Sequence, residues 1–241
     1  MSEASISLSG PAEVGHIHAD VSGGWLRASV FGAMDGLVTN IALISGVGAA
    51  GASPRFIVLT GMAGLVAGAF SMAMGEYASV KTQNEQVDRE WAREVEEIRD
   101  NAEMEELELA HMFAGMGMSE QTAIAAAHEI HLDPERAALV HVTQELGLDP
   151  EEKPSPKVAA ISSFLTFSLG ALVPLIPFLL GFASLAAGLL VGAAGLVVAG
   201  ALASFATTQS WWWSAIRQLL FGALAAGATY LVGLAIGVNV S

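Results

Sequence analysis

The sequence predicts an all-α integral membrane protein, with five transmembrane helices and a three-helix insert between helices two and three. Hydrophobic residues make up 53% of the 241 residues and charged residues only 14%, against about 25% charged in an ordinary soluble domain. The segment 82–153 holds 19 acidic and 5 basic residues, so it carries the whole formal net charge of −14. Residues 158–216 and 218–241 contain no charged residue and no histidine, and about 20 apolar residues span a bilayer as a helix.

The same composition excludes several other classes of protein. The absence of cysteine excludes a disulfide scaffold, and the acidic balance argues against nucleic acid as a partner. Glycine and proline are spread through apolar segments without a fixed period, which excludes a collagen-like or low-complexity chain.

The chain divides into four regions. Residues 1–24 form a polar, flexible tail with no basic stretch before the first apolar run, unlike a signal peptide. Residues 25–81 hold transmembrane helices one and two, residues 82–153 are the acidic insert, and residues 154–241 hold helices three to five. The expected spans are 25–49, 55–80, 157–180, 181–207 and 214–238.

Local signals separate the spans. A Gly/Ala/Ser/Pro turn at 49–54 divides the first from the second, and Pro174, Pro177 and Gly181 divide the third from the fourth. The run at 209–213 ends in three tryptophans, which favour the headgroup level, and divides the fourth from the fifth.

The basic residues predict the orientation, because positive charge in short flanks marks the cytosolic side. With the N-terminus inside, only Arg55 is placed outside. The basic residues at the cytosolic ends are then Arg27, Lys81, Lys153, Lys157 and Arg217. We therefore expect the tail and the insert in the cytosol and the C-terminus outside, in a multi-pass plasma-membrane protein, since no organelle-targeting signal is visible.

Glycines recur at four-residue spacing in the spans. The pairs are Gly32/Gly36, Gly64/Gly68, Gly188/Gly192 and Gly233/Gly237. Such spacing lets helix backbones approach closely in a membrane. It fits tight packing within one bundle or a dimer face, and the sequence does not choose between them.

Two acidic residues, Asp35 and Glu76, lie within the apolar spans, where a charge is a functional hypothesis by default. Asp35 lies roughly 12 Å along its helix from Arg27, and Met72 lies roughly 13–14 Å from Lys81. The two spans are expected to be antiparallel neighbours, so Asp35 and Met72 can face each other at one depth.

A carboxylate beside a thioether suits a first-row divalent ion such as Fe²⁺ better than Mg²⁺ or Ca²⁺. A carboxylate can also exchange a metal ion for a proton, as an antiporter requires. The further candidates for this path are Glu76, Asn40 and Met74. The alternative is that the methionines only fill gaps in the packing, with Asp35 capped by backbone.

The insert carries two Glu doublets. On one continuous helix, Glu94, Glu97, Glu105 and Glu108 fall within an arc of about 80°. Like charges on one face repel, so a positive partner is expected there, although a solvated acidic helix fits the same pattern. Glu108 and His111 also have the Glu-x-x-His spacing of di-iron bundles.

Two more helices are expected in the insert. One begins after an N-cap at Ser119, and the other begins at Pro134 and ends near Glu145 and Gly147. Residues 149–156 then form a proline-containing linker back to the membrane.

Several motifs together resemble the vacuolar iron transporter family, which has many bacterial members. They are residues 31–40 (FGAMDGLVTN), 71–77 (SMAMGEY), the Glu doublets, 145–148 (ELGL) and 170–177 (GALVPLIP). The resemblance runs from Trp25 to the end of the chain, and this chain is expected to be a bacterial member.

The resemblance implies a dimeric five-helix antiporter, not an enzyme, that exports Fe²⁺ and often Mn²⁺ from the cytosol in exchange for protons. It implies no prosthetic group, and Co²⁺ or Zn²⁺ are further possible cargoes. Asp35 and Met72 would line the path. The metal ligands of the insert would be Glu94, Glu97, Glu105, Glu108 and Glu145.

The chain departs from the family at one point. Where members often carry two methionines before the last Glu, it has His141 and Val142. Imidazole can replace a thioether as a ligand, so His141 joins the candidate metal ligands, whereas Val142 cannot coordinate.

The residues leave two other functions open. The chain could be a membrane-anchored, ferritin-like iron oxidase or metal sensor without transport, although a pure anchor has no need for Asp35 and Glu76. The insert could also be a docking surface for another protein.

Overall fold

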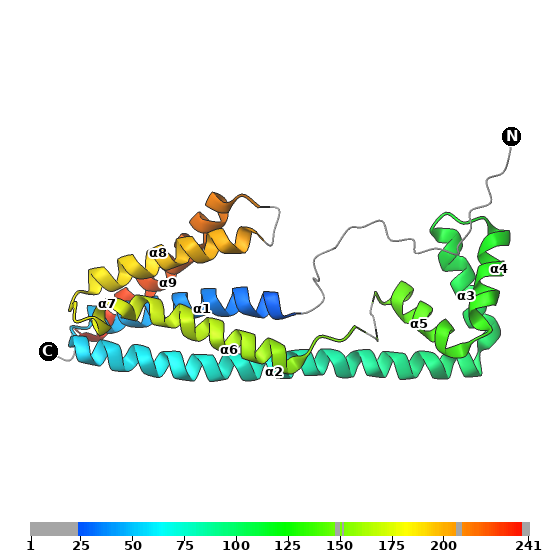
Figure 1. The fold of residues 1–241 in the computed structure, drawn as a ribbon, viewed down its shortest axis with the longest axis horizontal. Coiled ribbons are helices and arrows are strands. Elements are labelled where there is room, and N and C mark those ends of the chain that lie inside the picture. The colour runs from blue at the N-terminus through cyan, green and yellow to red at the C-terminus, as the bar shows by residue number, and fades with distance from the viewer. Residues whose placement is uncertain (1–23, 148–149, 151, 206–208, 238–241) are drawn as a thin grey trace.

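The computed structural model describes residues 24–147, 150, 152–205 and 209–237, and every regular element in this part of the chain is helical (Figure 1). The elements are α1 (Trp25–Ala49), α2 (Pro54–Asp100), α3 (Ala102–Gly115), α4 (Glu120–His131), α5 (Pro134–Glu145), α6 (Pro156–Leu172), the 3₁₀ turn η1 (Val173–Leu175), α7 (Ile176–Leu179), α8 (Leu185–Ser204) and α9 (Trp211–Gly237). The expected tail at 1–23 and part of the expected linker, 149 and 151, lie outside the described residues.

Five helical segments are long and apolar enough to cross a membrane, which confirms the expected number of spans. They are Trp25–Ala49, Pro54–Asp100, Pro156–Leu179, Leu185–Ser204 and Trp211–Gly237. The first begins and ends where the sequence predicts, and the third includes the interruption at η1, where Pro174 lacks the N–H that a continuous helix needs. The tryptophan run is not a linker, because residues 211–213 form the first turn of α9.

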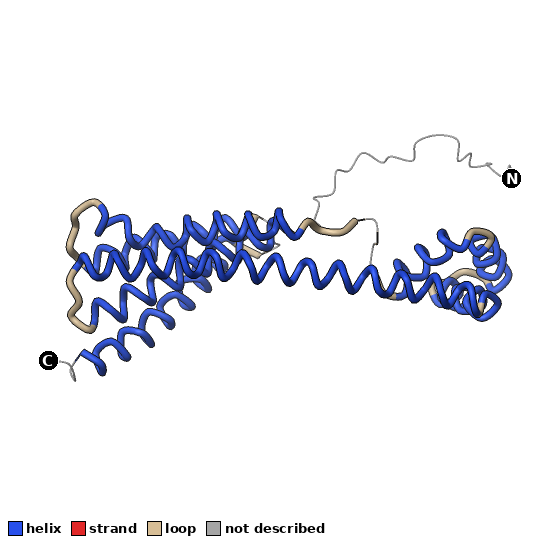
Figure 2. Tube along the Cα trace, turned by 90° about the horizontal axis from the view of Figure 1, so that it is seen from below, coloured by secondary structure: helices blue, strands red, loops and turns tan. Residues whose placement is uncertain are grey.

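The second span does not end at the membrane. Helix α2 continues unbroken for 47 residues, a length of about 70 Å at 1.5 Å per residue. Figures 1 and 2 show it running the length of the molecule, with the other spans beside its first half and α3, α4 and α5 gathered at its far end. One rigid element therefore belongs to both the membrane bundle and the insert.

Helix α6 packs against both α1 and α2. A Cβ at Gly36 of α1 would collide with the Phe167 carbonyl of α6, and a Cβ at Gly68 of α2 would collide with the Phe167 ring. Phe167 is fully buried between the two helices. The absence of side chains at these two glycines is what lets α6 approach both helices.

The other glycine pairs also face neighbouring helices of the same chain. Gly192 of α8 meets Ile41 of α1, and Gly233 of α9 meets the carbonyl of Gly46. Of the two interpretations left open by the sequence, the structure therefore uses these glycines for packing within one bundle.

The insert departs from the predicted continuous helix. The backbone at Asn101 leaves the helical region (φ −134°, ψ 36°) and ends α2, so the two Glu doublets lie on two different helices, α2 and α3. The single arc predicted for the four glutamates is therefore wrong. The insert comprises the end of α2 and three shorter helices.

The later helix boundaries are confirmed. Ser119 caps α4 by accepting a hydrogen bond from the Thr122 N–H, and Asp133 caps α5, whose first residue is Pro134. The insert has its own apolar core, in which Leu109 and Phe113 of α3 pack against Ala123 and Ala127 of α4. A second cluster joins Ile98 of α2 to Ala137 and Ala138 of α5.

The chain returns to the membrane alongside α2. The side-chain amide of Asn84 donates a hydrogen bond to the Pro154 carbonyl over 3.0 Å, and Lys153 pairs with Asp88. Farther along, Ala28, Val80 and Ala159 form a buried cluster of α1, α2 and α6. The returning chain is thus held to α2 by polar contacts at Asn84 and Asp88, and the apolar cluster at Val80 lies about one helical turn nearer the bundle.

The close approach of α1 and α6 yields a stability prediction. Gly36→Ala inserts a methyl group against the Phe167 backbone, which cannot move without displacing α6. We expect a loss of about 1–3 kcal/mol, as for overpacked cores, measured as a lower thermal unfolding midpoint in detergent. The matched control is Gly227→Ala on α9, where an added Cβ meets nothing within 4 Å. Equal midpoints for the two variants would contradict the packing described.

Candidate metal centre

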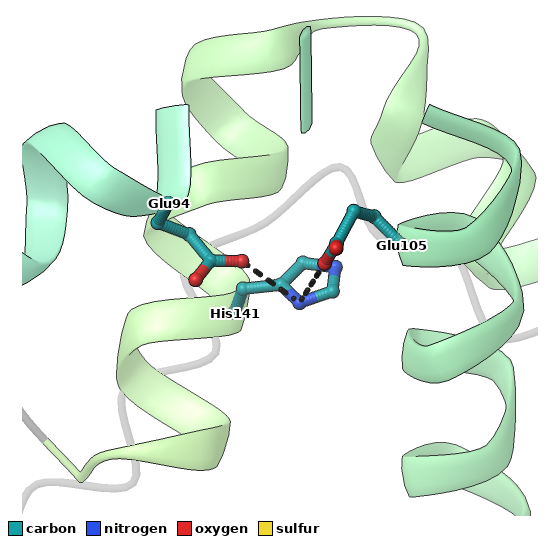
Figure 3. Close-up of side chains that lie close together, drawn as sticks. All are labelled: Glu94, Glu105 and His141. Atoms are coloured by element: carbon teal, nitrogen blue, oxygen red, sulfur yellow. Dashed lines mark ion pairs between the residues drawn. The ribbon is translucent and has the colours of Figure 1, made fainter. Parts of the chain in front are cut away.

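Three metal-ligating side chains meet inside the insert, one from each of three helices (Figure 3). Glu94 comes from α2, Glu105 from α3 and His141 from α5. The Nδ1 atom of His141 lies 3.2 Å from Glu94 Oε1 and 3.8 Å from Glu105 Oε2. One ligand atom from each residue lies within 4.8 Å of the other two.

These side chains are withdrawn from water. His141 is 0% exposed and Glu94 is 6% exposed, and Glu105 is partly buried. Neither His141 nitrogen has a hydrogen-bond partner, and neither has Glu94 Oε1, although Nδ1 and Oε1 are close. The two atoms are near each other without the alignment of a hydrogen bond, as expected for ligands directed at a common point with metal bonds of about 2.0–2.2 Å.

Burial sets the protonation states. Desolvation, followed by the negative charges of Glu105, Glu145, Glu97 and Glu108, raises the pKa of Glu94 to about 7. Desolvation and the charges of Glu108, Glu97 and Glu145 also raise the pKa of Glu105. Desolvation and the neighbouring His131 lower the pKa of His141 to about 4. Near neutral pH the imidazole is therefore neutral with a free lone pair, and a cation must compete with a proton on Glu94.

The other predicted insert ligands surround this triad. Glu97 pairs with Arg93 on its own helix at 3.1 Å. Glu108 and Glu145 are exposed, and their charges act on the buried carboxyls. Glu108 also lines an open surface groove of about 790 Å³ with Glu105 and His111. The predicted substitute His141 is central to the cluster, whereas Val142 is fully buried in the apolar core.

The path residues in the membrane are more dispersed. Asp35 accepts a long hydrogen bond from Thr39 at 3.5 Å, and Met72 packs beside Phe167 of α6. That the side chains of Asp35 and Met72 face each other remains a prediction. Met74 is 64% exposed in the single chain, and its place on the path also stays a prediction.

Asn40 and Glu76 have clear structural partners. The amide of Asn40 donates to the Ala171 carbonyl at 2.6 Å and the Gly61 carbonyl at 3.2 Å, and so joins α1 to α6 and α2. Glu76 is buried and forms an ion pair with Arg27 at 3.0 Å.

Two features of these sites were missed by sequence reasoning. Arg27 is more than the flanking charge that the sequence predicts, because it pairs with Glu76, 49 positions away. His131 belongs to no sequence motif, yet its ring lies edge-on to that of His141 with centroids 5.2 Å apart. Each contact crosses between helices, so no spacing along one helix could reveal it.

Comparison with known proteins gives consistent matches. The VIT family matches residues 26–234 of the chain. The vacuolar iron transporter of Centaurea cyanus is 30% identical over 219 residues, which cover 88% of each chain. Vacuolar iron transporter 1 of Eucalyptus grandis is 31% identical over 211 residues, covering 85% of this chain and 84% of the relative. The vacuolar iron transporter of Acanthamoeba castellanii is 32% identical over 228 residues, covering 92% and 84%.

The raised pKa of Glu94 predicts how metal affinity depends on pH. Below about pH 7 a cation must displace the Glu94 proton, so Mn²⁺ affinity should rise with pH, by up to about tenfold per unit for each proton displaced. The rise should level off above pH 7, because the carboxyl is then ionised, while His141 stays neutral throughout this range. Titration of the full-length protein with Mn²⁺, followed by electron paramagnetic resonance, measures this.

Two variants control that experiment. Glu94→Gln should weaken binding and flatten its pH dependence. Glu96→Gln, an exposed position on the same helix, should leave both unchanged. Wild-type affinity that does not vary between about pH 5 and pH 7 would contradict the proton competition.

Proposed function

This chain belongs to the VIT family, and on that basis we propose that it transports Fe²⁺, with Mn²⁺ as a second cargo, across a membrane in exchange for protons. The names of the relatives support iron as the cargo. The observation that carries the proposal is the buried Glu94–Glu105–His141 cluster, located at the far end of the helix that also bears Met72 and Glu76.

The donor set supports a divalent first-row ion. Two carboxylates and an imidazole suit Fe²⁺, Mn²⁺, Co²⁺ and Zn²⁺, whereas Cu⁺ prefers the softer sulfur ligands that the triad does not contain. Glu97, Glu108 and Glu145 surround the triad with negative charge, which raises the local concentration of cations. In this proposal the insert collects metal and the ion is cargo, not a resident cofactor.

Asp35, Met72 and Glu76 are proposed to line the path through the membrane. A carboxylate at this depth alternates between a metal-bound and a protonated form, which couples metal movement in one direction to proton movement in the other. Glu76 begins paired with the Arg27 guanidinium, so a metal ion using this carboxylate must first displace a cation. Asn40 takes a secondary place, because it joins helices, and Met74 stays a further candidate for the path.

We also propose an orientation, a membrane and an oligomeric state for this chain. The basic flanks support a cytosolic insert and an outside C-terminus, and the active unit is proposed to be a homodimer. The plasma membrane is our proposal for this chain, whereas the relatives are named for the vacuole. Removal of metal from the cytosol for homeostasis and detoxification is the same reaction in either membrane.

Reconstituted flux tests the transport proposal. Proteoliposomes with an acidic interior should accumulate Fe²⁺ under anaerobic conditions, and Mn²⁺ should compete. Asp35→Asn keeps the shape of the side chain but cannot carry the charge or exchange a proton, so flux should fall to the level of empty liposomes. Asp133→Asn, at a helix cap in the insert, is the control that should retain flux.

Other outcomes separate the alternatives. Flux that survives in Asp35→Asn would remove this residue from the mechanism. Flux that ignores the pH gradient would remove proton coupling. Oxidation of Fe²⁺ by the full-length protein without any flux would instead favour the membrane-anchored oxidase.

A further inference from the structure

The His141 side chain is buried without any hydrogen bond to its ring nitrogens. A neutral imidazole carries its proton on one nitrogen and a lone pair on the other. Nδ1 faces Glu94 and Glu105. If Nδ1 gives its lone pair to a metal, the proton must be on Nε2, and a buried N–H without an acceptor is costly.

A suitable acceptor lies beside it. His131, the last residue of α4, has its Nδ1 3.0 Å from the backbone carbonyl oxygen of Ala127. A carbonyl only accepts hydrogen bonds, so this contact puts the proton of the neutral ring on Nδ1 and leaves the lone pair on Nε2. That Nε2 atom is also buried without a partner. The structure thus holds an acceptor with its tautomer already selected.

The two rings are arranged to meet edge-on. Their centroids are 5.2 Å apart and their planes cross at 85°, within the usual range for edge-on aromatic pairs. The other histidine of α4, His128, lies three residues earlier and has a different environment, because its side chain is 63% exposed and pairs with Glu106 at 3.1 Å. Of the two α4 histidines, only His131 contacts the metal cluster.

We propose that His131 is the positioning residue of the insert metal site: when Glu94, Glu105 and the His141 Nδ1 lone pair hold a divalent cation, His131 Nε2 accepts the Nε2–H of His141, a hydrogen bond that neither atom makes in this structure. The relay runs from the Ala127 carbonyl through both rings to the metal. Partners of this kind fix the tautomer and ring orientation of metal-bound histidines. The inference rests on the proposed metal binding by the insert and adds a residue that touches no metal itself.

Two substitutions of His131 distinguish the loss of its hydrogen-bond acceptor from the loss of its aromatic ring. His131→Phe keeps an aromatic ring for edge-on packing but removes the acceptor, whereas His131→Gln loses the ring and keeps a carbonyl acceptor. The control is His128→Phe on the same helix. Each full-length variant is titrated in detergent with Co²⁺, followed by its visible absorption, and the Glu94→Gln/Glu105→Gln double variant supplies the background from other sites.

The expected pattern is specific. His131→Phe should weaken Co²⁺ binding about 10–100-fold, the usual effect of losing an outer-shell partner, with its metal-free thermal unfolding unchanged. His131→Gln should bind within a few-fold of wild type, and His128→Phe should match wild type. Wild-type affinity in His131→Phe overturns the proposal. Equal weakening in both His131 variants also overturns it, because packing or direct ligation by His131 would then be the cause.

A measurement on the unaltered protein covers the case in which a variant does not fold. With Zn²⁺ bound and histidines labelled with ¹⁵N, NMR should show His141 protonated at Nε2 and His131 protonated at Nδ1. A proton on Nδ1 of His141 in the Zn²⁺-bound form overturns the proposal. Wild-type protein that binds no more Co²⁺ than the double variant would overturn the insert's proposed role as well, whereas normal wild-type binding with the wrong tautomer rejects the inference alone.

Discussion

Polar groups placed away from water need partners, and this constraint organises both halves of the molecule. In the bundle Arg27 neutralises the buried Glu76 and Asn40 donates to two backbone carbonyls, although Asn40 Oδ1 and Ser163 Oγ are buried without a hydrogen-bond partner. In the insert the requirement is not met, because Glu94 Oε1 and both nitrogens of His141 lack hydrogen-bond partners. The contacts in the bundle hold helices together, whereas the unpartnered atoms in the insert leave electron pairs available, which agrees with the metal binding proposed for it.

The chemistry of the insert follows from that difference. The imidazole of His141 is neutral, and the pKa values of the Glu94 and Glu105 carboxyls are raised. Before a cation binds, the cluster therefore carries less negative charge than two ionised glutamates would. His141 and Val142, which stand where family members often carry two methionines, therefore have different roles. His141 places an imidazole at the centre of the Glu94–Glu105–His141 cluster, whereas Val142 is buried as part of the apolar core.

Much of the fold was predictable because membrane spans and helix caps are determined by residues that are close together in the sequence. The five apolar segments, the Ser119 cap and the start of α5 at Pro134 each depend on neighbours within a few residues. The break at Asn101 was not predictable, since the acidic pattern continues through it with an uninterrupted helical period. The Glu94–His141 contact could be anticipated only from the family resemblance, because it joins α2 to α5 across 47 positions.

The continuity of α2 has a further consequence for how this protein can vary. Glu76 and Glu94 lie on one unbroken helix, five turns apart at 3.6 residues per turn, so both carboxylates are on the same side of it. Adding or removing one residue between them would turn everything beyond, α5 included, by about 100° about the axis of α2 and shift it by about 1.5 Å relative to the bundle. Changes of about seven or eleven residues, close to two or three whole turns, would restore the alignment. Most residues between these two glutamates are exposed, so their side chains can change more readily than their number, which can change only by nearly whole turns.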